Sequence, residues 1–170
     1  MPRPRIQDGP PQLRAAALAM RRLDGTTLGD VYVRLQRTLS PEWTSLLAQH
    51  LTGIPQENTL MPGARVKAGN PPALVAADSS TRIGRDMIPT TDWPWWEYGA
   101  GDNEKRTYER RNRKQPGTHK VTRDTRAQLP RYRKGGRVIG PTVTMFLPRA
   151  AAFWVQSTIR GFMDAADRKS

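Results

Sequence analysis

The strongest constraint on the fold of this chain is a basic segment that runs from Lys105 to Lys134. It contains twelve lysines and arginines but only two acidic residues, Glu109 and Asp124, so it carries +10 of the total net charge of +13. Large aliphatic side chains are rare in this segment, and it therefore cannot bury enough apolar surface to offset the entropy lost on ordering. We expect an extended arm, projected by a small globular domain, that becomes fully ordered only against a partner.

The composition of the whole chain allows one domain with a modest core. Of its 170 residues 36% are hydrophobic, and its mean hydropathy is -0.70. There is no cysteine, which excludes disulfides and thiolate metal sites. A pI near 11.1 gives a positive field that attracts nucleic acid, acidic protein surfaces or anionic lipid.

Targeting and membrane signals are not found in the sequence. Met1 is followed by Pro-Arg-Pro-Arg-Ile, which lacks the apolar stretch of a signal peptide. No segment approaches the roughly 20 continuous apolar residues of a membrane span. We therefore expect no membrane contact and no export by this route.

Apolar residues recur at helical spacing in the first fifty residues and predict three helices. The first begins at Pro11 and the second follows Gly25. The third begins at the pair Ser40 and Pro41, because serine can cap a helix and proline suits the first helical position. We expect this third helix to end at Gly53.

The rest of the chain predicts short strands and one long helix. Residues 64–67 and 73–77 are expected to form two brief strands, 93–99 a third strand with aromatic rings on both faces, and 136–144 a fourth. A final helix opens at Pro148 and carries a regular apolar stripe, which we interpret as core. The stripe consists of Ala151, Ala152, Val155, Ile159, Phe162, Met163 and Ala166.

These elements predict an α+β fold with N-terminal helices, a small mainly antiparallel sheet, a long basic loop and a C-terminal helix packed on the sheet. We divide the chain into a leader at 1–10, the helices and first strands at 11–104, the basic arm at 105–135, and the returning strand and C-terminal helix at 136–170. Both flanks of the arm belong to one domain.

Catalytic constellations are missing from the sequence. His50 and His119 are the only histidines and lie in different predicted elements. Ser79 and Ser80 lack the G-x-S-x-G elbow, and no glycine-rich phosphate loop ends in Lys-Ser or Lys-Thr. We therefore predict no enzyme activity, no catalytic residues, no cofactor and no metal site.

The aromatic cluster before the arm has two interpretations. Trp93, Trp95, Trp96 and Tyr98 could form a platform on which nucleic acid bases stack. They could equally fill a core or a subunit interface, where tryptophan and tyrosine are enriched. We favour packing or interface, because these rings precede the basic arm and are not interleaved with it.

The arm has three interpretations: phosphate contacts, a solvated basic loop, or arginines that meet carboxylates of the next subunit. We favour the last, in which the cost of ordering is recovered only in an assembly. The expected contact residues of the arm are Arg110, Arg111, Arg113, Arg131, Tyr132, Arg133 and Lys134. The last four are expected to anchor it.

With its elements in this order, the chain resembles the small head-to-tail connector proteins of long-tailed bacteriophages, in the neck or tail-completion family common in phages of actinobacteria. The resemblance is carried by Gly136-Arg-Val-Ile-Gly-Pro-Thr, by the C-terminal stretch from Leu147 to Phe162, and by Glu97-Tyr98-Gly99 before the long loop. It leaves open whether the chain resembles an adaptor, a stopper or a tail terminator.

The resemblance implies a structural virion protein at the head-tail junction, assembled in the host cytoplasm. It implies a ring of identical subunits, commonly six, between portal-side and tail proteins, with genome DNA passing through its lumen. We expect the arm to face acidic protein neighbours, since a strongly basic wall would hinder sliding DNA. The alternative is a basic nucleic-acid-binding protein whose arm orders on DNA or RNA.

Overall fold

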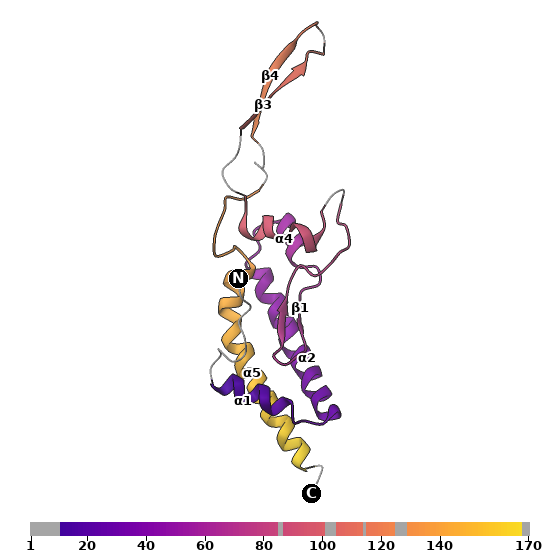
Figure 1. The fold of residues 1–170 in the computed structure, drawn as a ribbon, viewed down its shortest axis with the longest axis vertical. Helices are drawn as coiled ribbons and strands as arrows, with labels where there is room; N and C mark the ends of the chain where they lie inside the picture. The colour runs from indigo at the N-terminus through magenta and orange to yellow at the C-terminus, as the bar shows by residue number, and fades with distance from the viewer. Residues whose placement is uncertain (1–10, 85–86, 101–104, 114, 125–128, 168–170) are drawn as a thin grey trace.

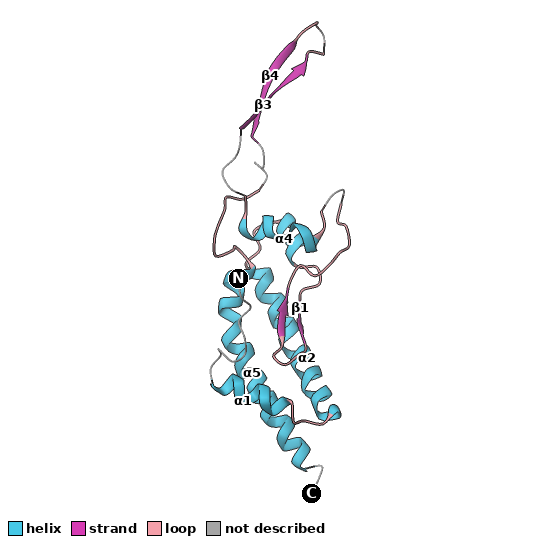
Figure 2. Ribbon diagram, in the orientation of Figure 1, coloured by secondary structure: helices cyan, strands magenta, loops and turns pink. Residues whose placement is uncertain are grey.

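The computed structural model describes residues 11–84, 87–100, 105–113, 115–124 and 129–167. The molecule is elongated: a helical body occupies one end and a β-hairpin projects from the other (Figures 1 and 2). The elements are α1 (Pro11–Met20), α2 (Gly25–Gln49), α3 (Ile54–Leu60), β1 (Arg65–Lys67), β2 (Ala73–Val75), α4 (Pro89–Tyr98), β3 (Lys105–Arg111), β4 (Thr118–Asp124) and α5 (Ile139–Asp167). The leader expected at 1–10 lies outside the described residues.

The predicted α+β class is confirmed, with helices at both ends of the chain and two small antiparallel sheets, β1–β2 and β3–β4. In the first sheet Val66 pairs with Leu74, as the predicted strands at 64–67 and 73–77 require. The C-terminal helix and this sheet share one core around Trp43 of α2. The Trp43 ring lies 5.7 Å from that of Phe146 on α5.

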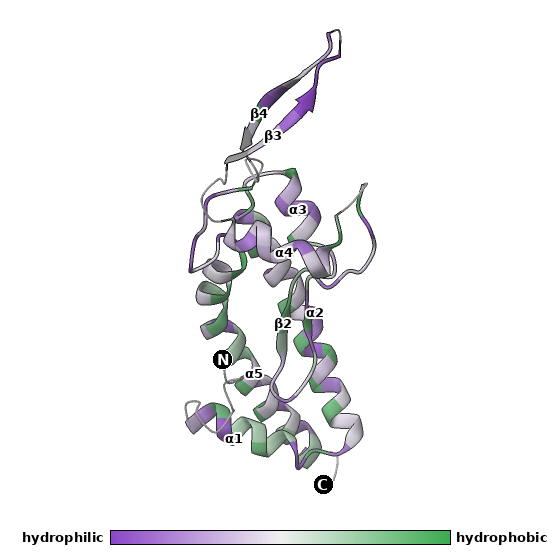
Figure 3. Cartoon of the chain, turned by 45° about the horizontal axis from the view of Figure 1, so that its top comes forward, coloured by the Kyte–Doolittle hydropathy of each residue, from purple (hydrophilic) through white to green (hydrophobic). Residues whose placement is uncertain are grey.

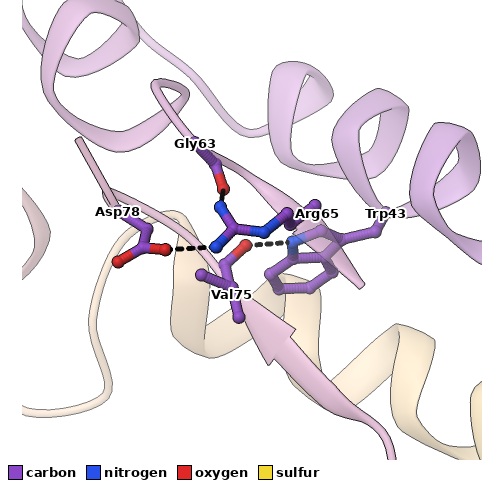
Figure 4. A network of polar contacts seen from close by, with 5 residues as sticks. All are labelled: Trp43, Gly63, Arg65, Val75 and Asp78. Atoms are coloured by element: carbon purple, nitrogen blue, oxygen red, sulfur yellow. Dashed lines mark hydrogen bonds and ion pairs between the residues drawn. The ribbon is translucent and has the colours of Figure 1, made fainter. Parts of the chain in front are cut away.

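A network of polar contacts fixes the β1–β2 sheet against α2 (Figure 4). The Trp43 indole N–H donates to the Val75 carbonyl at 2.8 Å. Arg65 donates to the Gly63 carbonyl at 2.8 Å and also pairs with Asp78. The sheet is thus tied to the helix by a buried tryptophan and closed at its edge by an ion pair.

Helix α2 is one continuous helix, so the break expected at Ser40 and Pro41 is wrong. Its buried residues keep helical spacing through that point: Val31, Leu35, Leu39, Trp43 and Leu47. Pro41 lies on the exposed side, and the Ser40 hydroxyl accepts the Val66 N–H at 3.0 Å instead of capping a helix. Continuous burial against one core outweighs a local proline signal.

The strand expected at 93–99 is also wrong, because these residues form the second half of α4. Pro89 occupies the first helical turn, and the Asp92 carboxylate accepts the Ile88 N–H at 2.6 Å. The aromatic residues suggested a strand through their β-propensity alone. A local turn with a proline start and a carboxylate partner determines the helix instead.

Helix α5 begins at Ile139, so the strand expected at 136–144 is wrong and Pro148 lies inside the helix. The proline at position 141 suits a first helical turn, where its missing N–H costs nothing. The Thr142 hydroxyl donates back to the Val138 carbonyl at 2.6 Å. The start of α5 is also fixed by the Glu97 carboxylate of α4, which accepts backbone N–H groups at this helix end.

The buried face of α5 is made largely of small and polar residues, and of the apolar stripe expected to form core only Val155 packs against it. The buried residues are Thr142, Phe146, Ala150, Trp154, Ser157, Thr158 and Gly161. A Cβ on Gly161 would lie 2.7 Å from Cγ2 of Val31, so α5 and α2 approach closely there. Small side chains at Ser157 and Gly161 permit that approach, while Phe146 and Trp154 supply the large apolar side chains of the buried face.

Candidate interaction surfaces

The basic segment is more ordered than we expected, because most of it forms the β3–β4 hairpin that projects from the body (Figure 1). At its middle, Tyr108 pairs with Val121 and Thr107 with Thr122, whose hydroxyls are 2.9 Å apart. These β-branched and aromatic pairs favour strands. The turn closes with a hydrogen bond from the Asn112 N–H to the Gly117 carbonyl at 3.0 Å.

The register separates charge between the two faces of the hairpin, which is strongly hydrophilic (Figure 3). On one face both acidic residues lie opposite lysines, Glu109 opposite Lys120 and Asp124 opposite Lys105. The other face, which we call the basic face, comprises positions 106, 108, 110, 119, 121 and 123. It contains three arginines, one histidine and no acidic residue.

The hairpin tip brings together three of the predicted contact residues. A hollow of about 430 Å³ is lined by Arg110, Arg111, Asn112, Arg113 and His119. His119 Nδ1 and Asn112 Oδ1 are 2.6 Å apart, which ties the two strands together beside the turn. Among the described residues no carboxylate lines this hollow, and we call its five lining residues the tip cluster.

The four residues expected to anchor the arm, Arg131 to Lys134, lie at its base. The Ala100 N–H donates to the Pro130 carbonyl at 2.9 Å, and the Arg133 N–H donates to the Tyr98 carbonyl at 2.7 Å. The side chains of all four residues are exposed. The base is therefore closed by the backbone, while these side chains remain available to a partner.

Glu97 supports the arm base, and the sequence did not single it out for this role. Its side chain is only 1% exposed. Its carboxylate accepts the backbone N–H groups of Val138, Ile139 and Gly140 at 3.1, 2.9 and 2.9 Å. A carboxylate at a helix N-terminus satisfies unpaired donors and complements the helix dipole. A lone acidic residue within an apolar aromatic stretch is the signal that could have revealed it.

The four aromatic residues do not form a single platform. Trp93 packs against the core and its ring lies 6.0 Å from that of Tyr98. Trp95 is 45% exposed, whereas Trp96 lines a hollow of about 330 Å³ together with Leu129, Pro130 and Arg137 at the arm base. The cluster therefore divides between packing within the body and exposed surface.

An exposed apolar stripe runs along α5. It consists of Met145, Pro148, Ala152, Ile159 and Met163, at intervals of three, four or seven residues. Met145, Ile159 and Met163 are 61, 54 and 63% exposed. The stripe lies on the side of the helix away from its buried face, so the body of the protein does not cover it.

A shallow apolar groove of about 300 Å³ lies beside the C-terminal half of this stripe, between α1 and α5. Alanines of α1 and apolar residues of α5 line it: Ala15, Ala16, Ala19, Val155, Ile159 and Phe162. Small alanine side chains on one wall allow another backbone to approach closely. Ile159 belongs to both the stripe and the groove, so the two surfaces adjoin.

Most acidic side chains in the described part of the body already have partners. Asp78 pairs with Arg65, Asp164 with Arg34, and Glu42 with Arg149, while Asp24, Asp92 and Glu97 accept backbone N–H groups. The hydrogen bond from Arg149 lowers the pKa of Glu42, and that from the Thr27 N–H lowers the pKa of Asp24. Within the described part of the body, few carboxylates are therefore left without a contact inside the same chain.

The described ranges contain neither a cluster of metal-ligating side chains nor a membrane-spanning helix. No group of three or more histidine, cysteine or acidic side chains is placed to hold a metal ion there. None of the helices in those ranges is long and apolar enough to cross a membrane. Comparisons with protein-family models, with curated proteins and with solved structures found no match.

Proposed function

We propose that this protein is a structural subunit of a homo-oligomeric assembly, and that the assembly is the ring that joins the DNA-filled head of a long-tailed phage to its tail. The exposed apolar stripe of α5 carries the proposal. From Met145 to Met163 it spans about 27 Å. Apolar surface of this length on a small domain is typical of a protein contact.

A second copy of the chain is the occupant that we assign to the stripe. The groove beside it is floored by alanines of α1, so a helix of another subunit could lie close against it. A closed ring uses two different patches on each subunit. We assign the stripe to one patch and the projecting arm to the other, with Arg131, Tyr132, Arg133 and Lys134 at the point where the arm leaves the body.

The hairpin supports an assembly role for a second reason. An isolated two-stranded hairpin is marginally stable in water, so contact with a partner would stabilise it. The order of elements also retains part of the resemblance to neck proteins, namely N-terminal helices, a short sheet, a long basic segment and a final helix. The stretch from Gly136 opens that final helix instead of forming a strand.

The assembly proposal is tested by measuring the mass of the purified full chain across a range of concentrations by light scattering. We expect a multimer for the wild type and a monomer for the double variant Ile159→Glu, Met163→Glu; both side chains are exposed, so their replacement should leave the core intact. The matched control is Gln36→Glu, Ser45→Glu, which adds the same charge at exposed positions of α2. A monomeric wild type, or a stripe variant that assembles normally, would refute the proposal.

The location in the neck is tested separately by counting copies in purified virus particles. A joint should be present in a few copies per particle. Hundreds of copies would indicate a capsid or tail-tube protein, and a complete absence from particles would rule out any structural role in the virion.

A further inference from the structure

We propose that the tip cluster of the hairpin binds the phosphodiester backbone of nucleic acid. Three guanidinium groups, those of Arg110, Arg111 and Arg113, line one hollow with Asn112 and His119. The planar guanidinium matches the geometry of phosphate oxygens and donates two parallel hydrogen bonds to them. The inference goes beyond the proposed function: it concerns the tip of the arm, whereas the assembly test concerns the α5 stripe, so the two proposals can fail separately.

The charges of the tip are not neutralised within the described part of the chain. None of the three arginines forms an ion pair there. Glu109, the adjacent acidic residue, lies opposite Lys120 and accepts a hydrogen bond from the Thr118 hydroxyl at 3.4 Å. An external anion would therefore remove the repulsion between neighbouring cations of the tip.

The register adds a second argument for an anionic ligand. The two acidic residues of the strands, Glu109 and Asp124, occupy register positions on the opposite face. The basic face has no acidic residue at any of its six positions, and Arg110 lies there opposite His119. An anion that approaches this face therefore meets no carboxylate of the two strands.

Nucleic acid fits this surface better than an acidic protein does. A two-stranded ribbon is narrow enough to enter the major groove of B-DNA, whose phosphates line both rims. Tyr108 lies on the basic face and is 43% exposed, so an aromatic ring is interleaved with the arginines. Aromatic rings beside cations suit nucleic acid, whereas carboxylates gain little from an aromatic face.

The test is fluorescence anisotropy with a labelled 20-base-pair DNA duplex, titrated with the full-length protein between 0.05 and 0.3 M NaCl. The variant replaces Arg110, Arg111 and Arg113 by alanine. Its matched control replaces three exposed arginines of the body, Arg21, Arg22 and Arg37, by alanine, which removes the same charge. A third variant replaces the same three arginines by lysine. It keeps the charge of the tip and serves as a control in case the alanine substitutions perturb the hairpin.

We expect the tip alanine variant to bind about 100-fold more weakly at 0.1 M salt and to lower the slope of log K against log salt by about 2.7, since each duplex phosphate contact contributes about 0.9. The body control should change either quantity much less, and the lysine variant should keep most of the slope. Equal losses in the tip variant and the body control would overturn the proposal. The proposal would also be overturned if poly-glutamate displaced the DNA as effectively as unlabelled DNA of the same total charge. That result would indicate an acidic protein partner.

Discussion

Replacement of Glu97 by glutamine should destabilise the whole fold, because this one carboxylate closes the start of α5. Glutamine has nearly the same shape but only one acceptor oxygen, and its amide group would face N–H donors. The carboxylate accepts three backbone N–H groups at 2.9 to 3.1 Å in a site that is 1% exposed. The change therefore isolates the loss of acceptor capacity and charge from any loss of packing.

The magnitude follows from the hydrogen bonds that glutamine cannot make. A bond to a charged group contributes about 1.5 to 3 kcal/mol, and a buried N–H left without a partner costs about 1 to 3 kcal/mol. With at least one donor abandoned and the remaining bonds no longer charge-assisted, we expect E97Q to lose about 3 kcal/mol of unfolding free energy. At a typical urea dependence of about 2 kcal/mol per molar, the midpoint should fall by about 1.5 M.

Urea unfolding followed by tryptophan fluorescence measures this shift, and amide hydrogen exchange at Val138, Ile139 and Gly140 reports the local effect. The matched control is Glu57→Gln on α3, an exposed position where the same substitution should leave the midpoint unchanged. If E97Q unfolded within about 0.2 M urea of the wild type, the role that we assign to this carboxylate would be incorrect.

Two further substitutions test the arm base and the α2–α5 contact. Gly99→Ala should lower the free energy of unfolding by about 2 kcal/mol. Gly99 has a φ of +81°, and a Cβ there would lie 2.3 Å from the Pro130 carbonyl oxygen. Unchanged urea unfolding together with unchanged hydrogen exchange at the Ala100 amide would contradict this prediction. Glu42→Gln should lower the thermal midpoint at pH 7, because the Arg149 hydrogen bond lowers the folded-state pKa of Glu42 below its usual 4.5. The stabilisation is complete above 4.5 and is lost as the pH falls through the folded pKa, so the difference between the two proteins should shrink at acidic pH. Thermal melting of both proteins from pH 7 to acidic pH tests this prediction. An equal difference in thermal midpoint at both ends of the range would show that the ion pair is not the source of the destabilisation.

The elements that could be predicted from the sequence are those with strong local signals. The strands β1 and β2 lie where short apolar runs flank a proline-rich turn, and α1 begins at its proline as expected. The start of α4 has a local signal, Pro89 with Asp92, which the aromatic pattern outweighed in the prediction, whereas the start of α5 could not be predicted. The start of α5 depends on Glu97, forty-one residues before the Val138 N–H that it accepts, and such a contact leaves no local trace.

The candidate surfaces were predicted only in part. Charge identified Arg110, Arg111 and Arg113, and the structure places them in one hollow. The hairpin itself was missed because low hydrophobicity argued against order, whereas cross-strand pairs such as Tyr108 with Val121 stabilise strands without a core. The apolar residues between Ala151 and Ala166 were assigned to the core because hydropathy measures the preference of a side chain and not the space available. Close helix packing leaves room only for a small residue at Gly161.

The backbone closure at the arm base makes the reach of this protein adjustable. The arm leaves the body at Ala100 and returns to it at Pro130, and a hydrogen bond joins these two residues. The structure of the body therefore does not depend on the length of the segment between them. Added pairs of residues in β3 and β4 would lengthen the projection by about 3.4 Å per residue pair, while the entropy of closing the insertion would grow only with the logarithm of its length. Such a chain can adapt to a more distant partner by changes in one segment, without any alteration of its core.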